Sequence, residues 1–356
     1  MRIEEIDKNF VSAKLGETEY RFLEVWQKPF VLSGLAWFEK EKLFCRLPQA
    51  HLESQNDGVK QLAWHTAGAQ VRFCSNSNKI ALRVKLLTPS NMAHMPASGQ
   101  SGFDLYVGAG KMKRFAKTAI PPINCDYYET LILDCPDTQV NREISINFPL
   151  YNGVKKVEIG FLPGTEISAP SEFAIPLPVL FYGSSITQGG CASRPGNAYC
   201  QILSRHLDFE CLNFGFSGSA RGELATAEVI ASLNLAAFVM DYDHNAPTLE
   251  HLQATHAPFY QFIRERQPEL PIIFVSRPDV DLNPEASDMR WQIIEKTFKQ
   301  GLAAGDRKLY FVDGRKLFGE KDRDACTVDG CHPNDLGFFR MAEHIEPALR
   351  QALGLS

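Results

Sequence analysis

The chain lacks three features that would assign it to a special class of protein. No apolar run is long enough to cross a membrane, and the N-terminal segment Met1–Asn9 is too charged for the hydrophobic part of a secretory signal. No lysine-rich or arginine-rich run occurs, and the formal net charge of −5 argues against a surface that binds nucleic acid. We therefore expect a cytoplasmic protein that binds neither membranes nor nucleic acids.

The cysteines form no recognisable framework. There are nine of them, an odd number, without a repeated Cys-x-x-Cys, which argues against disulfides and structural zinc. Cys326 and Cys331 lie close to His332 in the sequence, but no second pair completes a metal site. Cys331 is also a poor candidate nucleophile, because it is adjacent to the histidine that would have to serve as its base. We expect neither a metal nor another cofactor.

The pattern of apolar and polar residues changes near residue 170. At 356 residues with 44% hydrophobic content, the chain is long enough for two domains. Before residue 170, short β-branched and aromatic runs alternate apolar and polar residues, as half-buried antiparallel strands do. The predicted strands are 70–74, 79–86, 102–107, 128–134, 143–148 and 155–161. Residues 1–170 are therefore predicted to form an antiparallel, jelly-roll-like β-sandwich.

The second half alternates apolar strands with amphipathic helices. The predicted strands are 179–182, 210–214, 236–242, 272–276 and 309–312, and the predicted helices are 198–207, 225–233, 258–267, 287–304 and 335–353. This rhythm is typical of a three-layer, doubly wound α/β domain with a parallel sheet, here residues 177–356. The proline-rich stretch 169–178 is predicted to be a stiff linker, because proline fixes φ.

Two segments carry residues that suit acyl transfer. The run Phe181–Gly189 follows an apolar strand, and Gly183 allows a sharp turn that leaves Ser185 at the open end of the sheet. A serine needs a base to become nucleophilic, and His332 has a suitable pKa. Asp329 lies close enough in sequence to fix the tautomer of that histidine. Ser185, His332 and Asp329 are thus the candidate triad.

Each of these residues also has an ordinary structural interpretation. A Ser-Ser pair after a strand is often a helix cap or a turn, and Asp329-Gly330 is a common turn dipeptide. His332-Pro333 could begin a helix with Asn334 as its cap. Three other histidines have no such partners in the sequence, and structural or solvated roles are expected for them: His206, His251 and His256.

Four short blocks in order make the catalytic interpretation more specific. They are Gly183–Thr187, Leu212–Gly218, Asp243–Ala246 and Asp329–His332. Together they resemble the SGNH or GDSL esterase and lipase superfamily, whose fold is flavodoxin-like. The resemblance implies that Ser185 is the nucleophile and that three donors form an oxyanion hole. These donors are the N–H groups of Ser185 and Gly218 and the side-chain amide of Asn245.

Two positions depart from the pattern of that superfamily. Ser184 replaces an aspartate, and Asp243 replaces a glycine close to Asn245. A carboxylate aimed at a developing oxyanion would oppose it, so we expect the Asp243 side chain to point away or to be paired. His244, between Asp243 and Asn245, could line the pocket.

The first half carries a second resemblance. Gly102–Tyr106 matches the Gly-x-Asp-Leu-Tyr signature of an N-terminal β-domain found in one branch of these hydrolases. Ligand sites favour domain interfaces, so either the loop around Gly102–Tyr106, with Asp104 as a candidate pocket residue, or the polar segment 90–101 is expected to approach the cleft. The alternative is a β-domain that only covers apolar surface or mediates contacts in a homo-oligomer.

The function that follows is hydrolysis of carboxylic esters, with short-chain acyl or acetyl esters favoured, through an acyl-Ser185 intermediate. The partner would be a small-molecule ester such as an acylated carbohydrate or an acyl-CoA. An acyltransferase or a thioesterase with the same triad is the alternative, because only the second nucleophile differs. A third hypothesis is a catalytically silent protein whose β-domain binds carbohydrate.

Overall fold

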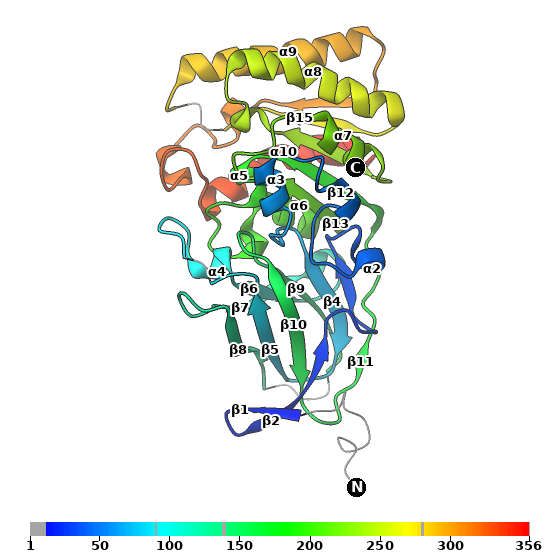
Figure 1. Cartoon of the computed structure of the whole chain (residues 1–356), viewed down its shortest axis with the longest axis vertical. Coiled ribbons are helices and arrows are strands. Elements are labelled where there is room, and N and C mark those ends of the chain that lie inside the picture. The colour runs from blue at the N-terminus through cyan, green and yellow to red at the C-terminus, as the bar shows by residue number, and fades with distance from the viewer. Residues whose placement is uncertain (1–11, 90, 137–139, 279–280, 356) are drawn as a thin grey trace.

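The computed structural model describes residues 12–89, 91–136, 140–278 and 281–355. Figure 1 shows an elongated body with a β-domain at one end and an α/β domain at the other. No helix within these residues is both long and apolar enough to cross a membrane.

Two antiparallel sheets form the N-terminal domain. The first has the order β1 (Ser12–Leu15), β2 (Thr18–Glu24), β10 (Val154–Phe161), β5 (Lys79–Leu86) and β8 (Tyr127–Asp134). The second has the order β11 (Ile167–Ser168), β4 (Gln70–Ser75), β9 (Arg142–Asn147), β6 (Phe103–Val107) and β7 (Arg114–Ala119), with β3 (Val31–Ser33) also paired to β4. Inward-facing residues of both sheets make one core, as in a sandwich.

The six strands predicted in this half are confirmed within one or two residues. The pattern missed β1, β2, β3, β7 and β11. Four of the six residues of β7 are exposed, so this strand shows no alternation of apolar and polar residues. Three of the other missed strands, β1, β3 and β11, have only four, three and two residues, and strands this short leave little trace in the sequence.

The C-terminal domain is built on one parallel sheet. Its order is β13 (Phe209–Gly215), β12 (Ile175–Gly183), β14 (Ala237–Asp241), β15 (Ile272–Val275) and β16 (Leu309–Val312). Val179 and Phe181 of β12 pack into a core with α6 (Tyr199–Leu207) and α10 (Asp335–Ala352). Leu180 and Tyr182 face the opposite core, with α7 (Leu224–Ala231), α8 (Leu249–Arg266) and α9 (Pro284–Ala303). The predicted three-layer architecture is confirmed.

Two predicted element boundaries were wrong, and prolines lie at both of them. The strand β12 begins at Ile175, which pairs with Phe209, so part of the expected linker belongs to the sheet. The register shifts between Ile175 and Val179, where the prolines cannot donate ladder bonds. Helix α8 begins at Leu249 rather than at Pro258, which lies inside it, because Thr248 caps the helix through a bond from His251 N–H.

One segment of the N-terminal half packs with the other domain. Between β3 and β4 the chain forms α2 (Phe38–Glu41) and α3 (Asp57–Leu62), and α3 lies beside the α/β sheet in Figure 1. Cys45, Leu47, Val59 and Ala63 join the core that contains the Leu180 side chain. Residues before position 170 therefore contribute to the core of the α/β domain.

Candidate active site

The candidate nucleophile stands at the C-terminal end of β12. Ser184 caps the short helix α5 (Ser185–Gln188), and its Oγ accepts a bond of 3.1 Å from Ile186 N–H. The predicted cap interpretation therefore holds for Ser184, whereas Ser185 is the first residue of the helix. Gly183 is required at the turn, because a Cβ there would lie 2.1 Å from Thr187 Oγ1.

His332 contacts Ser185 across 147 residues of sequence, and Asp329 contacts His332 from the other side of the ring. His332 Nε2 lies 3.0 Å from Ser185 Oγ, and His332 Nδ1 lies 2.8 Å from Asp329 Oδ2. Asp329 Oδ1 accepts the N–H groups of Cys331 and His332 at 3.0 and 2.7 Å, so the turn itself aims the carboxylate. The three groups thus have the order nucleophile, base and orienting acid that a serine hydrolase needs. Asn334 also caps α10, as its alternative interpretation predicted.

The surroundings set the charges of this pair. Partial burial acts to raise the pKa of Asp329, but the bonds from His332 outweigh it and hold that pKa below its usual value. Contact with the Cys331 thiol is the main cause that raises the pKa of His332 to about 9, with burial opposing and Asp329 adding to the rise. The surroundings of His332 therefore favour its protonated form.

The predicted oxyanion donors come from the ends of neighbouring strands. Gly218 lies in the loop after β13 with a φ of +65°, a conformation that favours glycine. Asn245 follows β14 in a short 3₁₀ turn, and its Nδ2 donates to Phe216 O at 2.9 Å. One amide proton is thus used to hold the loop, which leaves the second for a ligand. Because parallel strands end at one edge of the sheet, both loops face the α5 turn.

Gln188 connects the loop of Gly218 to the N-terminal domain, and the sequence analysis did not single it out. Its Oε1 accepts Ser217 N–H at 3.1 Å, and its Nε2 donates to Leu150 O at 3.0 Å. The same Nε2 lies 3.2 Å from His65 Nδ1. The signal that could have revealed Gln188 is its place three residues after Ser185 on the same helical turn. Through it, the N-terminal domain touches the oxyanion loop.

Asp243 is buried and partly paired. Its Oδ2 accepts Arg277 N–H at 3.2 Å, and the other carboxylate oxygen has no hydrogen-bond partner among the described residues. Burial raises the pKa of Asp243, and the nearby Arg277 lowers it in part. Asp241 is also buried, and burial, together with the charge of Asp243, raises its pKa to about 8. The expected pairing of Asp243 is thus found for one of its two carboxylate oxygens.

His244 and Cys331 form a contact beside the triad. His244 Nε2 lies 3.1 Å from Cys331 Sγ. Burial acts to raise the pKa of this thiol, but His244 and His332 lower it to about 7. Donor atoms of Asp329, Cys331 and His332 lie within 4.8 Å of one another and could hold a metal ion. Asp329 and His332 are, however, already bonded to each other.

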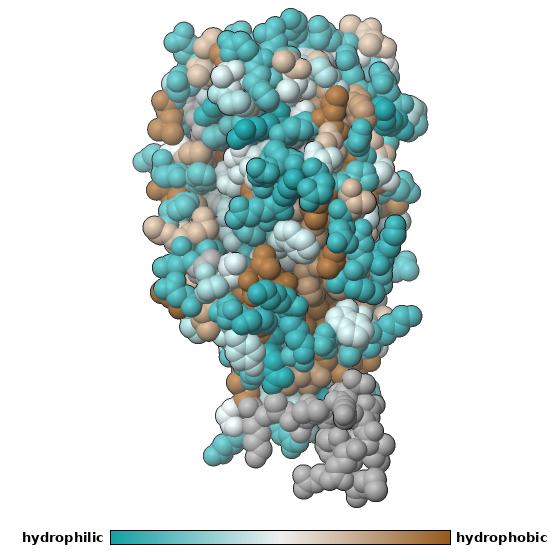
Figure 2. Space-filling model, in the orientation of Figure 1, coloured by the Kyte–Doolittle hydropathy of each residue, from teal (hydrophilic) through white to brown (hydrophobic). Residues whose placement is uncertain are grey.

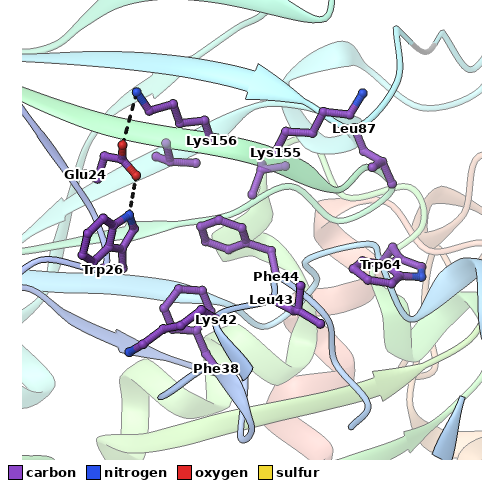
Figure 3. A pocket seen from close by; sticks show the side chains of 12 residues that line it. Glu24, Trp26, Phe38, Lys42, Leu43, Phe44, Trp64, Leu87, Lys155 and Lys156 are labelled. Carbon is purple, nitrogen blue, oxygen red and sulfur yellow. Dashed lines mark hydrogen bonds and ion pairs between the residues drawn. The ribbon is translucent and has the colours of Figure 1, made fainter. Parts of the chain in front are cut away.

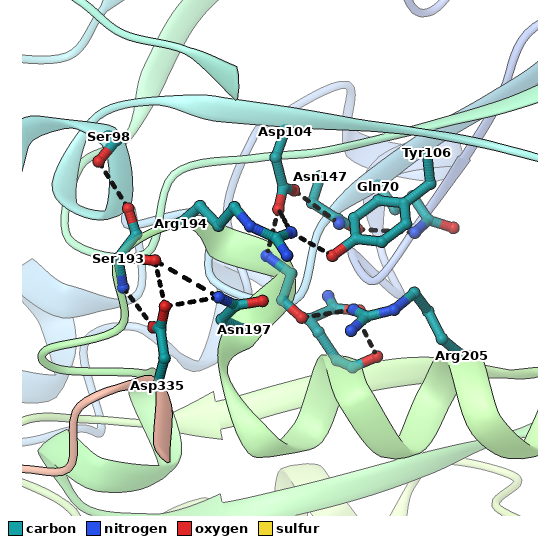
Figure 4. Close-up of polar contacts among 12 residues, drawn as sticks. Gln70, Ser98, Asp104, Tyr106, Asn147, Ser193, Arg194, Asn197, Arg205 and Asp335 are labelled. Carbon is teal, nitrogen blue, oxygen red and sulfur yellow. Dashed lines mark hydrogen bonds and ion pairs between the residues drawn. The ribbon is translucent and has the colours of Figure 1, made fainter. Parts of the chain in front are cut away.

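Asp104 does not line an open pocket, contrary to the sequence-based prediction. It is fully buried, and its Oδ2 accepts Arg194 Nη1 at 2.8 Å and Gly196 N–H at 2.9 Å. Its Oδ1 accepts Asn147 Nδ2 at 2.8 Å, and Figure 4 shows this carboxylate at the centre of the network. The Asp-Leu-Tyr motif therefore fastens the β-domain to the loop before α6.

The same interface continues toward the C-terminal block. Asp335, the first residue of α10, accepts Ser193 N–H at 2.8 Å and Asn197 Nδ2 at 2.8 Å, as Figure 4 shows. Ser193 O in turn accepts a bond from the Ser98 hydroxyl of the N-terminal domain. The start of α10, three residues after His332, is thus tied to both domains.

The segment 91–96 does approach the triad. The ring centroid of His94 lies 5.9 Å from that of His332, and the His94 side chain is exposed. Met92, half-buried, packs against the core of the α/β domain. Of the two alternatives predicted for the β-domain, this segment is the one whose described contacts include His332.

A separate cleft of about 470 Å³ opens on the N-terminal domain. Figure 3 shows Phe44 between Trp26 and Trp64, with lysines at the rim. Trp26 is 50% exposed, and its indole N–H donates to Glu24, which also pairs with Lys156 at 3.3 Å. Figure 2 shows hydrophobic surface near the middle of this otherwise largely hydrophilic face. No residue of the predicted site lines this cleft.

Comparison with known proteins finds a family match for each half of the chain. Residues 177–350 match the model of the GDSL-like lipase/acylhydrolase family, and residues 20–167 match the N-terminal domain of SGNH-hydrolase-type esterases. The chain therefore belongs to the GDSL, or SGNH, hydrolases that act on ester bonds, in the branch with the Gly-x-Asp-Leu-Tyr β-domain. Among curated proteins, no sequence matches the chain.

Solved structures share the whole two-domain arrangement. A protein from Bacteroides ovatus described as a GDSL-like lipase has 29% identity and a TM-score of 0.86, over 95% of this chain and 99% of its own. A salicylyl-acyltransferase from a tetracycline biosynthetic pathway has 18% identity and a TM-score of 0.77, over 94% and 98%. An acetyl xylan esterase from Butyrivibrio proteoclasticus has 13% identity and a TM-score of 0.58, over 94% and 99%.

Proposed function

We propose that the protein hydrolyses short-chain acyl esters, acetyl esters of carbohydrates in particular, through an acyl-Ser185 intermediate. The observation that carries the proposal is the chain of contacts from Ser185 Oγ to His332 Nε2 and from His332 Nδ1 to Asp329, at 3.0 and 2.8 Å. No other serine of the four sequence blocks has such a described contact with a histidine.

The mechanism follows from the geometry. His332, when neutral, removes the Ser185 proton as Oγ attacks the acyl carbonyl, and the resulting imidazolium is stabilised by Asp329. The oxyanion would accept bonds from the N–H groups of Ser185 and Gly218 and from the free amide proton of Asn245. His332 then returns its proton to the leaving alcohol, which departs. Water repeats these steps on the acyl-enzyme and releases the acid.

Two observations support a substrate with a small acyl group on a polar alcohol: the names of the similar structures and the exposed His94 at the edge of the candidate site. An acetyl xylan esterase and several carbohydrate esterases of family two share the fold. The exposed imidazole of His94 beside the His332 ring offers a hydrogen-bonding group to the alcohol part of a substrate. This contact comes from the β-domain, so we assign to segment 91–96 a role in substrate selection.

Acyl transfer is the second candidate, because a salicylyl-acyltransferase covers nearly the same length of chain. The two functions differ only in the nucleophile that meets the acyl-enzyme. The test is a screen of acetyl, propionyl and longer acyl esters, sugar acetates and acyl-CoA, each with and without an added alcohol acceptor. Free acid as the main product supports hydrolysis. A new ester that forms only when the acceptor is present would instead support acyl transfer and contradict the proposal of hydrolysis.

A further inference from the structure

The loop that carries Gly218 is held from outside its own domain. Its neighbouring carbonyl groups accept bonds from two residues of the segment between β3 and β4, which belongs by sequence to the N-terminal half. These residues are Arg46 and Asn56. Neither is part of any of the four sequence blocks.

Arg46 lies under the end of β13. It is 1% exposed, and its Nη1 donates to Gly215 O at 2.7 Å and to Asn213 O at 2.8 Å. Its Nη2 donates to Leu62 O at 2.7 Å, and the guanidinium lies 4.5 Å from the centre of the Phe216 ring. No carboxylate pairs with Arg46 within the described ranges. A buried cation whose partners are main-chain carbonyls is costly unless those bonds are made, so it fixes the backbone that it contacts.

Asn213 links the end of β13, which Arg46 holds, to the helix that begins with Ser185. Its Nδ2 donates to Thr187 O at 2.7 Å, within α5, and its Oδ1 accepts Gly215 N–H at 2.8 Å. The end of β13 is therefore bonded on one side to Arg46 and on the other to the helix that begins with Ser185. Displacement of Arg46 would change the distance between Ser185 N–H and Gly218 N–H.

Asn56 holds the far side of the loop. It caps α3 by accepting Val59 N–H at 3.0 Å, and its Nδ2 donates to Ser219 O at 2.9 Å and to Glu223 Oε1 at 2.8 Å. Gly58 makes this approach possible, because a Cβ there would lie 2.0 Å from Ser219 Oγ. Gly218 thus stands between two anchored carbonyls, those of Gly215 and Ser219.

We infer that Arg46 and Asn56 are positioning residues for the oxyanion hole, so that the N-terminal half is required for the chemical step and not for substrate selection alone. The inference rests on the proposed function. An oxyanion hole acts only when its donors are fixed before charge develops, and a small displacement of one donor weakens transition-state binding more than substrate binding.

The test compares Arg46→Met, Arg46→Lys and Asn56→Ala with a matched control, Arg72→Met. Arg72 is also a buried arginine, bonded to Glu143 at 3.2 Å and to Ser171 O at 2.6 Å, and its described partners lie outside the oxyanion loop. Steady-state kinetics with a chromogenic acetyl ester give kcat and KM. Inhibition by a small boronic acid, which forms a tetrahedral adduct with an active serine, gives the affinity for a transition-state mimic.

Arg46→Met and Asn56→Ala are expected to lower kcat by about 10- to 100-fold with little change in KM, and to weaken boronate binding in the same proportion. Arg46→Lys should recover part of the loss. The Arg72→Met control should keep kcat within about threefold of the wild type. If Arg46→Met does not fold, Asn56→Ala decides, since it removes no buried charge.

The inference would be overturned if the wild type is active and both Arg46→Met and Asn56→Ala keep its kcat, or lose no more of it than Arg72→Met does. That result would leave the proposed function intact. A wild type without turnover on any ester of the screen would instead remove the proposed function. Loss of kcat without a parallel loss of boronate affinity would show that the two residues support the fold only, and this would also overturn the inference.

Discussion

The hydroxyl of Tyr151, in the N-terminal domain, donates a hydrogen bond of 3.0 Å to the main-chain carbonyl of Ser185. Burial raises the pKa of this phenol well above its usual value, so the hydroxyl keeps its proton at neutral pH and remains a hydrogen-bond donor. Leu150, the residue before it, accepts a bond from Gln188 on the same helix. The β-domain thus contacts the turn of the candidate nucleophile directly.

The first prediction concerns Asp104. Because this buried carboxylate satisfies Arg194 and the Gly196 N–H across the domain interface, Asp104→Ala leaves a cation without its partner. We expect a loss of about 3 kcal/mol in the free energy of unfolding, measured by denaturant titration, and a lower melting temperature. The preference among substrates should change little. Glu39→Ala, which breaks the exposed pair with Lys42, is the control and should have almost no effect.

A shift in substrate preference by Asp104→Ala at unchanged stability would contradict this account. That result would support the role of Asp104 as a pocket residue, which the sequence analysis predicted.

The second prediction concerns Asn245. Its amide is placed to donate to the oxyanion while it holds Phe216 O, so Asn245→Ala should lower kcat by about 100- to 1000-fold with a much smaller change in KM. The matched control is Asn234→Ala, at an exposed asparagine before β14, which should keep wild-type kinetics. Equal kinetics for the two variants would exclude Asn245 from the oxyanion hole.

The third prediction is a pH profile that depends on Cys331. His332 must be neutral to act as the base, and its pKa is raised to about 9, so kcat/KM should rise with pH up to about that value. The groups that face the ring are Asp329, the Cys331 thiol and the exposed imidazole of His94. Cys331 is the largest cause of the shift, so Cys331→Ala should move the midpoint to lower pH.

The measurement is kcat/KM for the acetyl ester from pH 5 to about 10 in both proteins. Cys331→Ala is then more active than the wild type, relative to its own maximum, near pH 7. A midpoint that does not move, or a flat profile, would contradict the assignment of His332 as the base or of Cys331 as the residue that tunes it.

The sequence predicts which residues meet in the candidate site better than it predicts the contacts that hold those residues in place. Ser185, Asp329 and His332 are detectable because each occupies a short motif, and the alternation of strands and helices brings the motifs to one sheet edge. Arg46, Asn56 and Tyr151 have no such motif. Their roles depend on contacts between segments more than 30 residues apart, for example the 167 residues that separate Arg46 from Asn213.

The sequence carries one signal for Arg46. It is the only charged residue in the run Phe44–Leu47, and an arginine that is buried together with apolar neighbours needs specific partners. The misplaced start of α8 has a different cause. A proline at the first turn of a helix is favourable, so Pro258 was read as a start, although α8 accommodates it in its interior.

The central claim is that Ser185 is the nucleophile. The most direct measurement is mass-spectrometric peptide mapping of the protein after reaction with a fluorophosphonate, made alongside turnover of a chromogenic acetyl ester by the wild type and by Ser185→Ala. We predict a single label, on Ser185, and complete loss of both labelling and turnover in the folded variant. A label on Ser184, or substantial turnover by Ser185→Ala, would contradict the account.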